Sequence, residues 1–264
     1  MMQLKRSNVS TKSIHERGTA ARLAHAWYRC SVGSLDKPAR VGSFVKQGLR
    51  VPIERLAANE VDATEVVTIA DLFAVENEYQ LSVTRAQLAR HAWNVRLDEE
   101  LQIGLLIRCM NAKRLFEIGT FNGSTTRCMA EAAGPDAVVY TLDLPPAQFD
   151  SEQSPENFSG SMVGSVYRGT SEEPRITQLL GDSRTFDYGP YAGTMDFVFV
   201  DAAHDYKHGI VDSRNALKLV RPGGLIVWHD FVPHWAGLVH AIREATEGMP
   251  LRRLGGTSMA LLQT

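Results

Sequence analysis

The chain has few cysteines, which argues against two kinds of small-protein framework. Only three cysteines occur in 264 residues, Cys30, Cys109 and Cys128, and they are odd in number and widely spaced. A disulfide framework needs an even set, and a structural zinc site needs pairs of cysteines at short spacing. We therefore expect reduced thiols, with Cys109 and Cys128 in structural roles.

Long hydrophobic runs are also missing. No run of about 18 apolar residues is present that could span a bilayer, and the opening sequence MMQLKRSN lacks the apolar centre of a signal peptide. The sequence therefore predicts a cytoplasmic protein without a membrane partner.

The overall charge is small, with a formal net charge of −2, so the chain has no general field to attract nucleic acid. Basic residues gather locally, because the first 55 residues contain 11 Lys and Arg against Glu16, Asp36 and Glu54. They are scattered among Gly, Ser and Ala, which favours a solvated arm over a nucleic-acid surface. We expect no nucleic-acid partner and regard this arm as a candidate for homodimer formation or for covering a substrate.

Hydrophobic residues make up 44% of the chain, enough for a sizeable core. Composition predicts an N-terminal basic arm and helical extension over residues 1–83 and a catalytic domain over residues 84–264. Spacing permits short helices over 20–27 and 61–75 and one or two amphipathic helices over 84–110.

Short apolar runs then alternate with helical segments, which predicts an α/β fold with a doubly wound, mostly parallel, seven-stranded sheet. The last segment, residues 251–262, contains two apolar runs around Gly255-Gly256-Thr257 and predicts an antiparallel hairpin that closes the sheet. The parallel strands are expected at Arg114–Gly119, Val138–Asp143, Ile176–Gly181, Met195–Asp201 and Leu225–Asp230.

The first of these strands leads into a glycine-rich turn and then into a helix expected over Ser124–Ala133. Gly119 and Gly123 have no Cβ, so the polar end of a cofactor can approach the backbone, and the amides that open the helix can donate to an anion. The spacing is E-x-G-x-x-x-G from Glu117 and differs from the dinucleotide pattern G-x-G-x-x-G. This difference favours S-adenosylmethionine (SAM) as cofactor, although a turn shaped by its glycines alone is the plainer alternative.

An acidic residue ends the second strand about twenty positions further on. Asp143 is placed to accept hydrogen bonds from ribose hydroxyls, or else it is a loop or helix-capping aspartate. Asp182, after the third strand, is a candidate acceptor for an exocyclic amine, with an Asx turn as the alternative. The candidate cofactor-binding residues are Glu117, Gly119, Thr120, Phe121, Gly123, Ser124, Asp143, Leu144, Asp182, Ser183 and Asp201.

Two more acidic residues follow the fourth and fifth strands. If these strands are neighbours, their backbones lie about 5 Å apart, so Asp201 and Asp230 face the same pocket. Such a pair favours a divalent cation such as Mg²⁺, or a raised pKa in one carboxyl. His204 is the candidate general base because it lies just past the fourth strand, between Asp201 and Asp205, and imidazole titrates near neutral pH; a structural or surface histidine is the alternative.

The sheet pattern, together with the motifs DAAHDY, RPGG and WHDF, resembles the class I SAM-dependent methyltransferases, over roughly residues 85–264. It is most similar to small-molecule O-methyltransferases of the catechol, caffeoyl-coenzyme A and antibiotic-sugar types. The resemblance implies methyl transfer to a hydroxyl of a sugar or aromatic natural product, with His204 and Asp201 as catalytic residues and Asp182 near adenine. The catechol-type pattern has an Asp-Asn pair after the fifth strand, but here the pair is Asp230-Phe231. The third metal ligand is therefore missing at its expected place, and His229 or a water is a candidate substitute.

Three alternatives remain open at this point. An NAD(P)-dependent oxidoreductase fits the sheet and Asp143 but not the glycine spacing. A non-catalytic protein that binds the cofactor or a partner through its basic arm is the second. The third is a metal-dependent hydrolase, whose cluster is Asp201, His204, His229, Asp230 and His234.

The connection over residues 144–175 is too long for an ordinary turn, so it is expected to be a lid or a disordered segment. His234 and Trp235 are candidates for the acceptor pocket, with packing as the alternative for Trp235. The apolar residues of the connection that would fold onto a substrate are Phe149, Phe158, Met162 and Tyr167.

Overall fold

The computed structural model describes residues 41–74, 83, 91–148 and 160–264. The chain divides into two compact units, Met1–Leu56 and Ala57–Thr264. The predicted helix over 20–27 lies outside the described residues. Among the residues that are described, no helix has both the length and the apolar character needed to cross a membrane.

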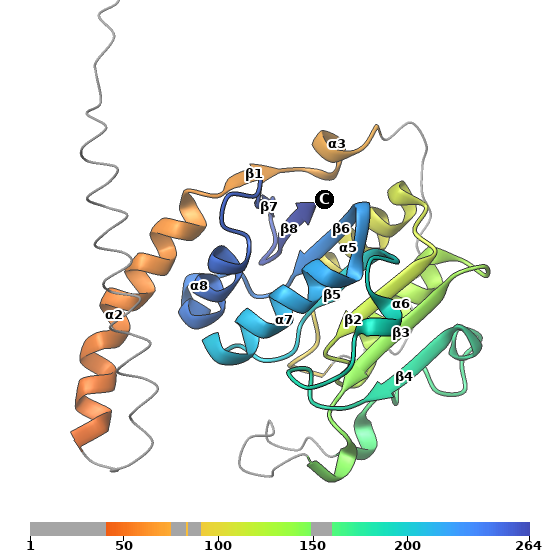
Figure 1. Cartoon of the computed structure of the whole chain (residues 1–264), viewed down its shortest axis with the longest axis horizontal. Helices are drawn as coiled ribbons and strands as arrows, with labels where there is room; N and C mark the ends of the chain where they lie inside the picture. The colour runs from red at the N-terminus through yellow and green to blue at the C-terminus, as the bar shows by residue number, and fades with distance from the viewer. Residues whose placement is uncertain (1–40, 75–82, 84–90, 149–159) are drawn as a thin grey trace, which may run out of the picture. The chain divides into compact units, whose positions relative to one another are not determined.

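The second unit is built on an eight-stranded sheet with the order β1-β7-β8-β6-β5-β2-β3-β4 (Figure 1). Within the described chain β8 alone runs antiparallel to its neighbours, β6 and β7, and the other pairings are parallel. The strands are β1 (Glu65–Val67), β2 (Arg114–Ile118), β3 (Val138–Asp143), β4 (Ile176–Leu180), β5 (Met195–Val200), β6 (Val220–Trp228), β7 (Arg252–Leu254) and β8 (Ala260–Gln263).

Helices cover both faces of this sheet, as its buried apolar strands require. The helices α5 and α6 share one hydrophobic cluster with Leu115, Phe197 and Val227 of the sheet. On the other face α7 packs against α8, and Ser213 of α7 accepts a hydrogen bond from Trp228 Nε1 at 3.0 Å. The helices are α2 (Val41–Asp62), α3 (Ile69–Leu72), α5 (Leu97–Met110), α6 (Ser124–Ala133), α7 (Tyr206–Leu219) and α8 (Ala236–Ala245).

The predicted α/β class, its five parallel core strands and the C-terminal hairpin are confirmed. Helix α6 has the predicted bounds. Single-turn 3-10 helices lie at Pro146–Gln148, Gly160–Met162, Glu173–Arg175, Gly189–Tyr191 and Pro233–Trp235.

The sheet has one strand at its edge that was not predicted. The spacing over 61–75 permits a short helix, which is present as α3, but β1 precedes it and pairs in parallel with β7. Pairing with a neighbour outweighs the local pattern in so short a segment, and the sheet has eight strands where seven were expected. The helical prediction over 84–110 is confirmed for α5, while residues 84–90 lie outside the described chain.

Residues 160–175 of the long connection pack against the glycine turn. Gly164 N donates to Phe121 O at 3.0 Å, and Val166 N donates to Asn122 O at 2.9 Å. The ring of Tyr167 is buried so closely against Gly123 that a Cβ there would lie 2.5 Å from Tyr167 Cδ1. Tyr167 therefore belongs to the packed interior, whereas Phe149 and Phe158 lie outside the described residues.

The two described cysteines agree with the expectation of thiols. Cys109 is partly buried, Cys128 is buried, and neither is in a disulfide within the described chain.

Candidate active site

The glycine turn after β2 has a backbone that only glycine fits comfortably. Gly119 has φ +103°, and a Cβ placed on it would lie 2.1 Å from the carbonyl oxygen of Asp201 on the neighbouring strand end. Gly123 has φ +82° and caps α6. The turn therefore comes close to Asp201 because its first residue has no side chain.

Glu117 lies beneath this turn and is 1% exposed. Its Oε2 accepts hydrogen bonds from the hydroxyls of Thr126 and, at 2.5 Å, Thr141. Burial raises the pKa of Glu117 to about 8, although the two hydroxyls oppose this shift. Near neutral pH the carboxyl is therefore mainly in its neutral form.

Asp143 at the end of β3 holds the glycine turn from the other side. Its Oδ2 accepts from Phe121 N and its Oδ1 from Leu144 N, both at 2.7 Å. Burial raises the pKa of the carboxyl despite these bonds. In this structure Asp143 is bonded to the loop backbone, and the side chain keeps partial exposure toward solvent.

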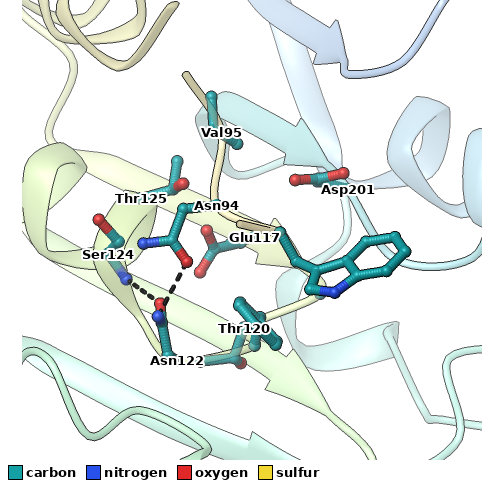
Figure 2. A pocket seen from close by; sticks show the side chains of 11 residues that line it. Asn94, Val95, Glu117, Thr120, Asn122, Ser124, Thr125 and Asp201 are labelled. Atoms are coloured by element: carbon teal, nitrogen blue, oxygen red, sulfur yellow. Dashed lines mark hydrogen bonds between the residues drawn. The ribbon is translucent and has the colours of Figure 1, made fainter. Parts of the chain in front are cut away.

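A pocket with an empty volume of about 260 Å³ opens beside the turn. In Figure 2 the dashed lines mark the hydrogen bonds of Asn122 with Asn94 and with the backbone of Ser124. The pocket is lined by Trp93, Asn94, Val95, Glu117, Gly119, Thr120, Phe121, Asn122, Ser124, Thr125 and Asp201.

Six of the predicted cofactor residues therefore meet at this pocket: Glu117, Gly119, Thr120, Phe121, Ser124 and Asp201. The remaining five are not among its lining residues: Gly123, Asp143, Leu144, Asp182 and Ser183.

The wall formed by residues 93–95 was not predicted from the sequence. Trp93 is 56% exposed although it lines the pocket, and Asn94 Oδ1 accepts from Asn122 Nδ2 at 2.8 Å. One signal could have pointed to it, an aromatic residue in a polar stretch directly before the acidic first turn of α5. Its contact with the glycine turn, 28 residues later in the chain, is not visible in any local pattern.

At the end of β4, the Asx-turn alternative for Asp182 is the one observed. Asp182 Oδ1 accepts from Arg184 N at 2.9 Å, and Oδ2 lies 2.6 Å from the Arg184 guanidinium. Arg184 holds the pKa of this carboxyl near 2. Ser183 uses its carbonyl to accept from Tyr188 and Asn215.

Past the ends of β5 and β6 lies a group of charged side chains, as the sequence predicted for Asp201 and Asp230. His204 Nε2 lies 2.7 Å from Asp230 Oδ2 and 4.0 Å from Asp201 Oδ1. The ring of His204 also stacks on Trp235, with centroids 4.5 Å apart. Contacts with Asp230 and Asp201 outweigh the effect of burial and raise the pKa of His204. Burial would raise the pKa of Asp230, but the hydrogen bonds and charges of His204 and His229 lower it.

His229 joins the group from the end of β6. Its Nδ1 lies 3.3 Å from Asp201 Oδ1 and 3.5 Å from Asp230 Oδ2, and its Nε2 lies 3.2 Å from Glu99 Oε2. Burial alone would lower the pKa of His229, but the charge of Asp201 and the contacts with Asp230 and Glu99 raise it to about 12. Glu99 was not predicted from the sequence, because it approaches the site from α5, far away in the chain.

Three of these residues offer ligand atoms at metal-site spacing. One ligand atom each of Asp201, His229 and Asp230 lies within 4.8 Å of the others, within the described part of the chain. Phe231, at the place where the catechol-type pattern has its third ligand, is 1% exposed and apolar. Among the described residues, His229 is the one that adds a third donor atom to those of Asp201 and Asp230.

The family model described as "Methyltransferase domain" matches residues 116–231. The chain is 30% identical over 193 residues to the flavonoid 3',5'-methyltransferase of Vitis vinifera, covering 68% of this chain and 74% of that protein. It is 28% identical over 172 residues to caffeoyl-CoA O-methyltransferase 2 of Populus trichocarpa, covering 64% of each chain.

Two solved structures share the fold. The Bacillus cereus O-methyltransferase in complex with SAH superposes with a TM-score of 0.50 at 18% identity, covering 67% of this chain and 86% of that one. The O-methyltransferase TomG of Streptomyces achromogenes in complex with SAM gives 0.50 at 19% identity, covering 90% and 95%. With the glycine turn, the strand order and these relatives taken together, the chain belongs to the class I SAM-dependent O-methyltransferase family.

Proposed function

We propose that the protein transfers the methyl group of SAM to a hydroxyl of a small molecule, an aromatic natural product or a sugar. The observation that carries the proposal is that the glycine-turn pocket reaches Asp201, which belongs to the same group of side chains as His204 and Asp230. A cofactor pocket thus adjoins a base with its carboxylate partner. The names of the plant relatives favour an aromatic acceptor.

The pocket residues suit the amino-acid end of SAM. The pocket is small and open to solvent, so it would hold one end of the cofactor only. The carboxyl of Asp201 complements the positive sulfonium and ammonium groups, and Glu117 offers a carboxyl oxygen as a hydrogen-bond acceptor to the ammonium. Asp143 and Leu144 would then hold the ribose, and Asp182 and Ser183 the adenine once Arg184 moves aside. When bound, SAM supplies a methyl group on a positively charged sulfur.

The chain's own part in the reaction is alignment and proton removal. His204 would take the proton of the acceptor hydroxyl at Nδ1, as a general base. Asp230, 2.7 Å from the other ring nitrogen, Nε2, would stabilise the imidazolium that forms, and Trp235, which packs against the ring at a tilt, would restrict its orientation. Asp201 would face both the cofactor pocket and the acceptor.

A divalent cation, Mg²⁺ in the sequence-based prediction, would be held by Asp201 and Asp230 and would polarise the acceptor oxygen. Residues 84–264 are proposed as the catalytic domain, with residues 1–83 as an extension. A homodimer, a cytoplasmic location and the absence of nucleic-acid and membrane partners stay predictions.

Binding of S-adenosylhomocysteine (SAH), the spent cofactor, tests the proposal directly. At a ligand concentration of 100 Kd, a single site stabilises the folded state by about 2.7 kcal/mol. For a chain of this size that corresponds to a rise in Tm of roughly 5–10 °C, measured by differential scanning fluorimetry. NAD⁺ and NADP⁺ are the controls and are expected to leave Tm unchanged. Stabilisation by either dinucleotide and not by SAH would favour the oxidoreductase instead.

A screen for the acceptor follows from the same assay. Catechols, flavonoids and glycosides are incubated with SAM, and mass spectrometry detects a gain of one CH₂. Methylated product from a hydroxylated compound supports the proposal. The proposal is contradicted if the protein converts SAM to SAH and methanol, with the methyl passing to water, and methylates none of these compounds.

Glu117→Gln is expected to change how stability depends on pH. The ordinary pKa of the carboxyl is 4.5 and burial raises it to about 8 in the folded state. Between these values the folded state holds more protons than the unfolded state, so stability falls as pH rises through this window. The glutamine cannot ionise, so the variant should gain roughly 2–3 kcal/mol on the wild type between pH 6 and pH 9.

Urea unfolding at pH 6, 7.5 and 9 measures this difference. Glu131→Gln, on the partly exposed side of α6, is the matched control and should follow the wild-type curve. If the Glu117→Gln curve ran parallel to the wild type, Glu117 would not be a neutral carboxyl in the folded protein.

A further inference from the structure

We infer that His229 is the third protein ligand of a divalent metal site completed by Asp201 and Asp230, and that Glu99 positions it. A site with one nitrogen and two oxygen donors would take a transition-metal ion, such as Mn²⁺, Co²⁺ or Zn²⁺, in preference to Mg²⁺. The inference deepens the proposed methyl transfer and rests on it, because the metal would lie beside the acceptor hydroxyl.

The nitrogen of His229 that faces the two carboxylates is the first observation. His229 Nδ1 is a buried atom with no hydrogen-bond partner among the described residues. The nearest acidic oxygens, on Asp201 and Asp230, lie 3.3 and 3.5 Å away. The three atoms bound a space in which a cation could meet all of them.

The other nitrogen of the His229 ring, Nε2, is held by Glu99. His229 Nε2 lies 3.2 Å from Glu99 Oε2, and Glu99 Oε1 accepts from Ser258 N at 2.7 Å and from Ser258 Oγ at 2.9 Å. Glu99 is 1% exposed, so its position is fixed by these bonds. A carboxylate that accepts the Nε2 proton leaves the lone pair on Nδ1, which is the arrangement found behind metal-ligating histidines.

The conformation around Asp230 favours His229, the residue before it, as third ligand over Phe231, the residue after it. Phe231 is buried, and its amide donates to Ser258 O at 2.8 Å, so its side chain belongs to the core. Asp230 itself has φ +57°, a left-handed conformation that is uncommon for an aspartate. Such strained residues cluster at functional sites, where the surroundings hold them in place. Here the conformation accompanies a carboxylate that faces both His229 and His204.

The donor set determines the class of metal. Carboxylates alone suit Mg²⁺ and Ca²⁺, whereas an imidazole raises the affinity for first-row transition metals. Three protein ligands also leave coordination positions for oxygens of an acceptor. The competing interpretation is an ion-pair network, in which a protonated His229 takes the place of the cation between Asp201 and Asp230.

A Co²⁺ titration separates the two interpretations. The full chain is treated with a chelator, dialysed and titrated with CoCl₂ while its visible absorption is recorded, and MgCl₂ is then added as competitor. We expect one Co²⁺ per chain, displaced by Mg²⁺ only in large excess. His229→Asn should weaken Co²⁺ binding at least tenfold, and Glu99→Gln about 10- to 100-fold, the range known for residues behind metal ligands.

His240→Asn is the matched control, because His240 is also a largely buried histidine, with its Nδ1 3.0 Å from Glu60. It should bind Co²⁺ as the wild type does. In case His229→Asn fails to fold, the wild type alone gives a second measurement. A Co²⁺-shifted, exchangeable imidazole N–H resonance in its proton NMR spectrum would report a coordinated histidine with its far nitrogen protonated.

The inference is overturned if the wild type binds no Co²⁺, if Mg²⁺ binds as tightly, or if His229→Asn leaves Co²⁺ binding unchanged. SAH binding is measured by calorimetry in the same preparations. A wild type that binds SAH but no Co²⁺ refutes the metal site and leaves the proposed methyl transfer standing. A folded wild type that binds neither refutes both.

Discussion

His204→Ala is expected to lower kcat about 100- to 10,000-fold, the range attributed to a general base, while the affinity for SAH stays at the wild-type value. The reason is position, because His204 Nε2 lies 2.7 Å from Asp230 and faces Asp201, which lines the cofactor pocket. Removing the imidazole leaves the acceptor hydroxyl without a group to take its proton. The proposed cofactor contacts, on the glycine turn, remain. The measurement is initial rate of methyl transfer to the acceptor found by screening, with SAH binding by calorimetry.

His208→Ala is the matched control for this prediction. His208 is also paired with a carboxylate, since its Nδ1 lies 2.5 Å from Asp205 Oδ2, but it belongs to the first turn of α7 and not to the group around Asp230. It should keep wild-type kcat. Equal losses in both variants, or a loss of SAH affinity that accounts for the rate, would assign His204 a structural role.

The sequence could predict the parts of the fold and site that depend on neighbours along the chain. Apolar runs predicted the core strands. Asp201 and Asp230 follow two of these strands, and ligands of a parallel sheet lie at the carboxyl ends of its strands, so both residues could be predicted as part of the site. The glycine turn could be predicted because Gly119 and Gly123 lie close together in the sequence, directly after an apolar run. These features are local, so a single sequence contains them.

Features that depend on long-range contacts could not be predicted in this way. Asn94 meets Asn122 across 28 residues, and Glu99 meets Ser258 across 159. Glu99 is a charged residue in the acidic first turn of a helix, a place that is usually exposed. Only the packing of α5 against the hairpin and the end of β6 makes it part of the site. The strand β1 was missed for the same reason, since its pairing with β7 joins distant parts of the chain.

The role of Asp182 could not be decided from the sequence, because it depends on the position of the Arg184 side chain. The sequence left two roles open for Asp182, a turn and an adenine contact, and the structure has the turn together with an ion pair to Arg184. This pair is largely exposed, and exposed pairs contribute roughly 0–1 kcal/mol. A bound adenine could therefore displace Arg184 at small cost, so the observed turn does not conflict with the proposed contact.

Gly119→Ala is expected to lower the free energy of unfolding of the domain by about 2–5 kcal/mol and to abolish SAH binding. A Cβ at this position would lie 2.1 Å from the Asp201 carbonyl oxygen and 2.9 Å from Ala202 Cα, and φ is +103°. The clash is with backbone atoms, so no side chain can rotate away and β2 and β5 would have to separate. Overpacking of this kind costs about 1–3 kcal/mol or more, and the strained φ adds about 1–2 kcal/mol. Domains are stable by roughly 5–15 kcal/mol, so a loss of about 2–5 kcal/mol is readily measured by urea unfolding.

Gly193→Ala separates the clash from the strained backbone. Gly193 also has a positive φ, +65°, but a Cβ there would meet nothing within 4 Å. This variant should lose only about 1–2 kcal/mol and should bind SAH as the wild type does. The excess loss in Gly119→Ala then measures the close approach of the turn to Asp201, the same approach that brings the cofactor pocket next to the proposed acceptor site. Equal losses of stability in both variants, with SAH binding kept in both, would contradict the prediction. The turn would then have room for a Cβ at residue 119, although that Cβ would lie 2.1 Å from the Asp201 carbonyl oxygen, and the pocket would not depend on the close contact.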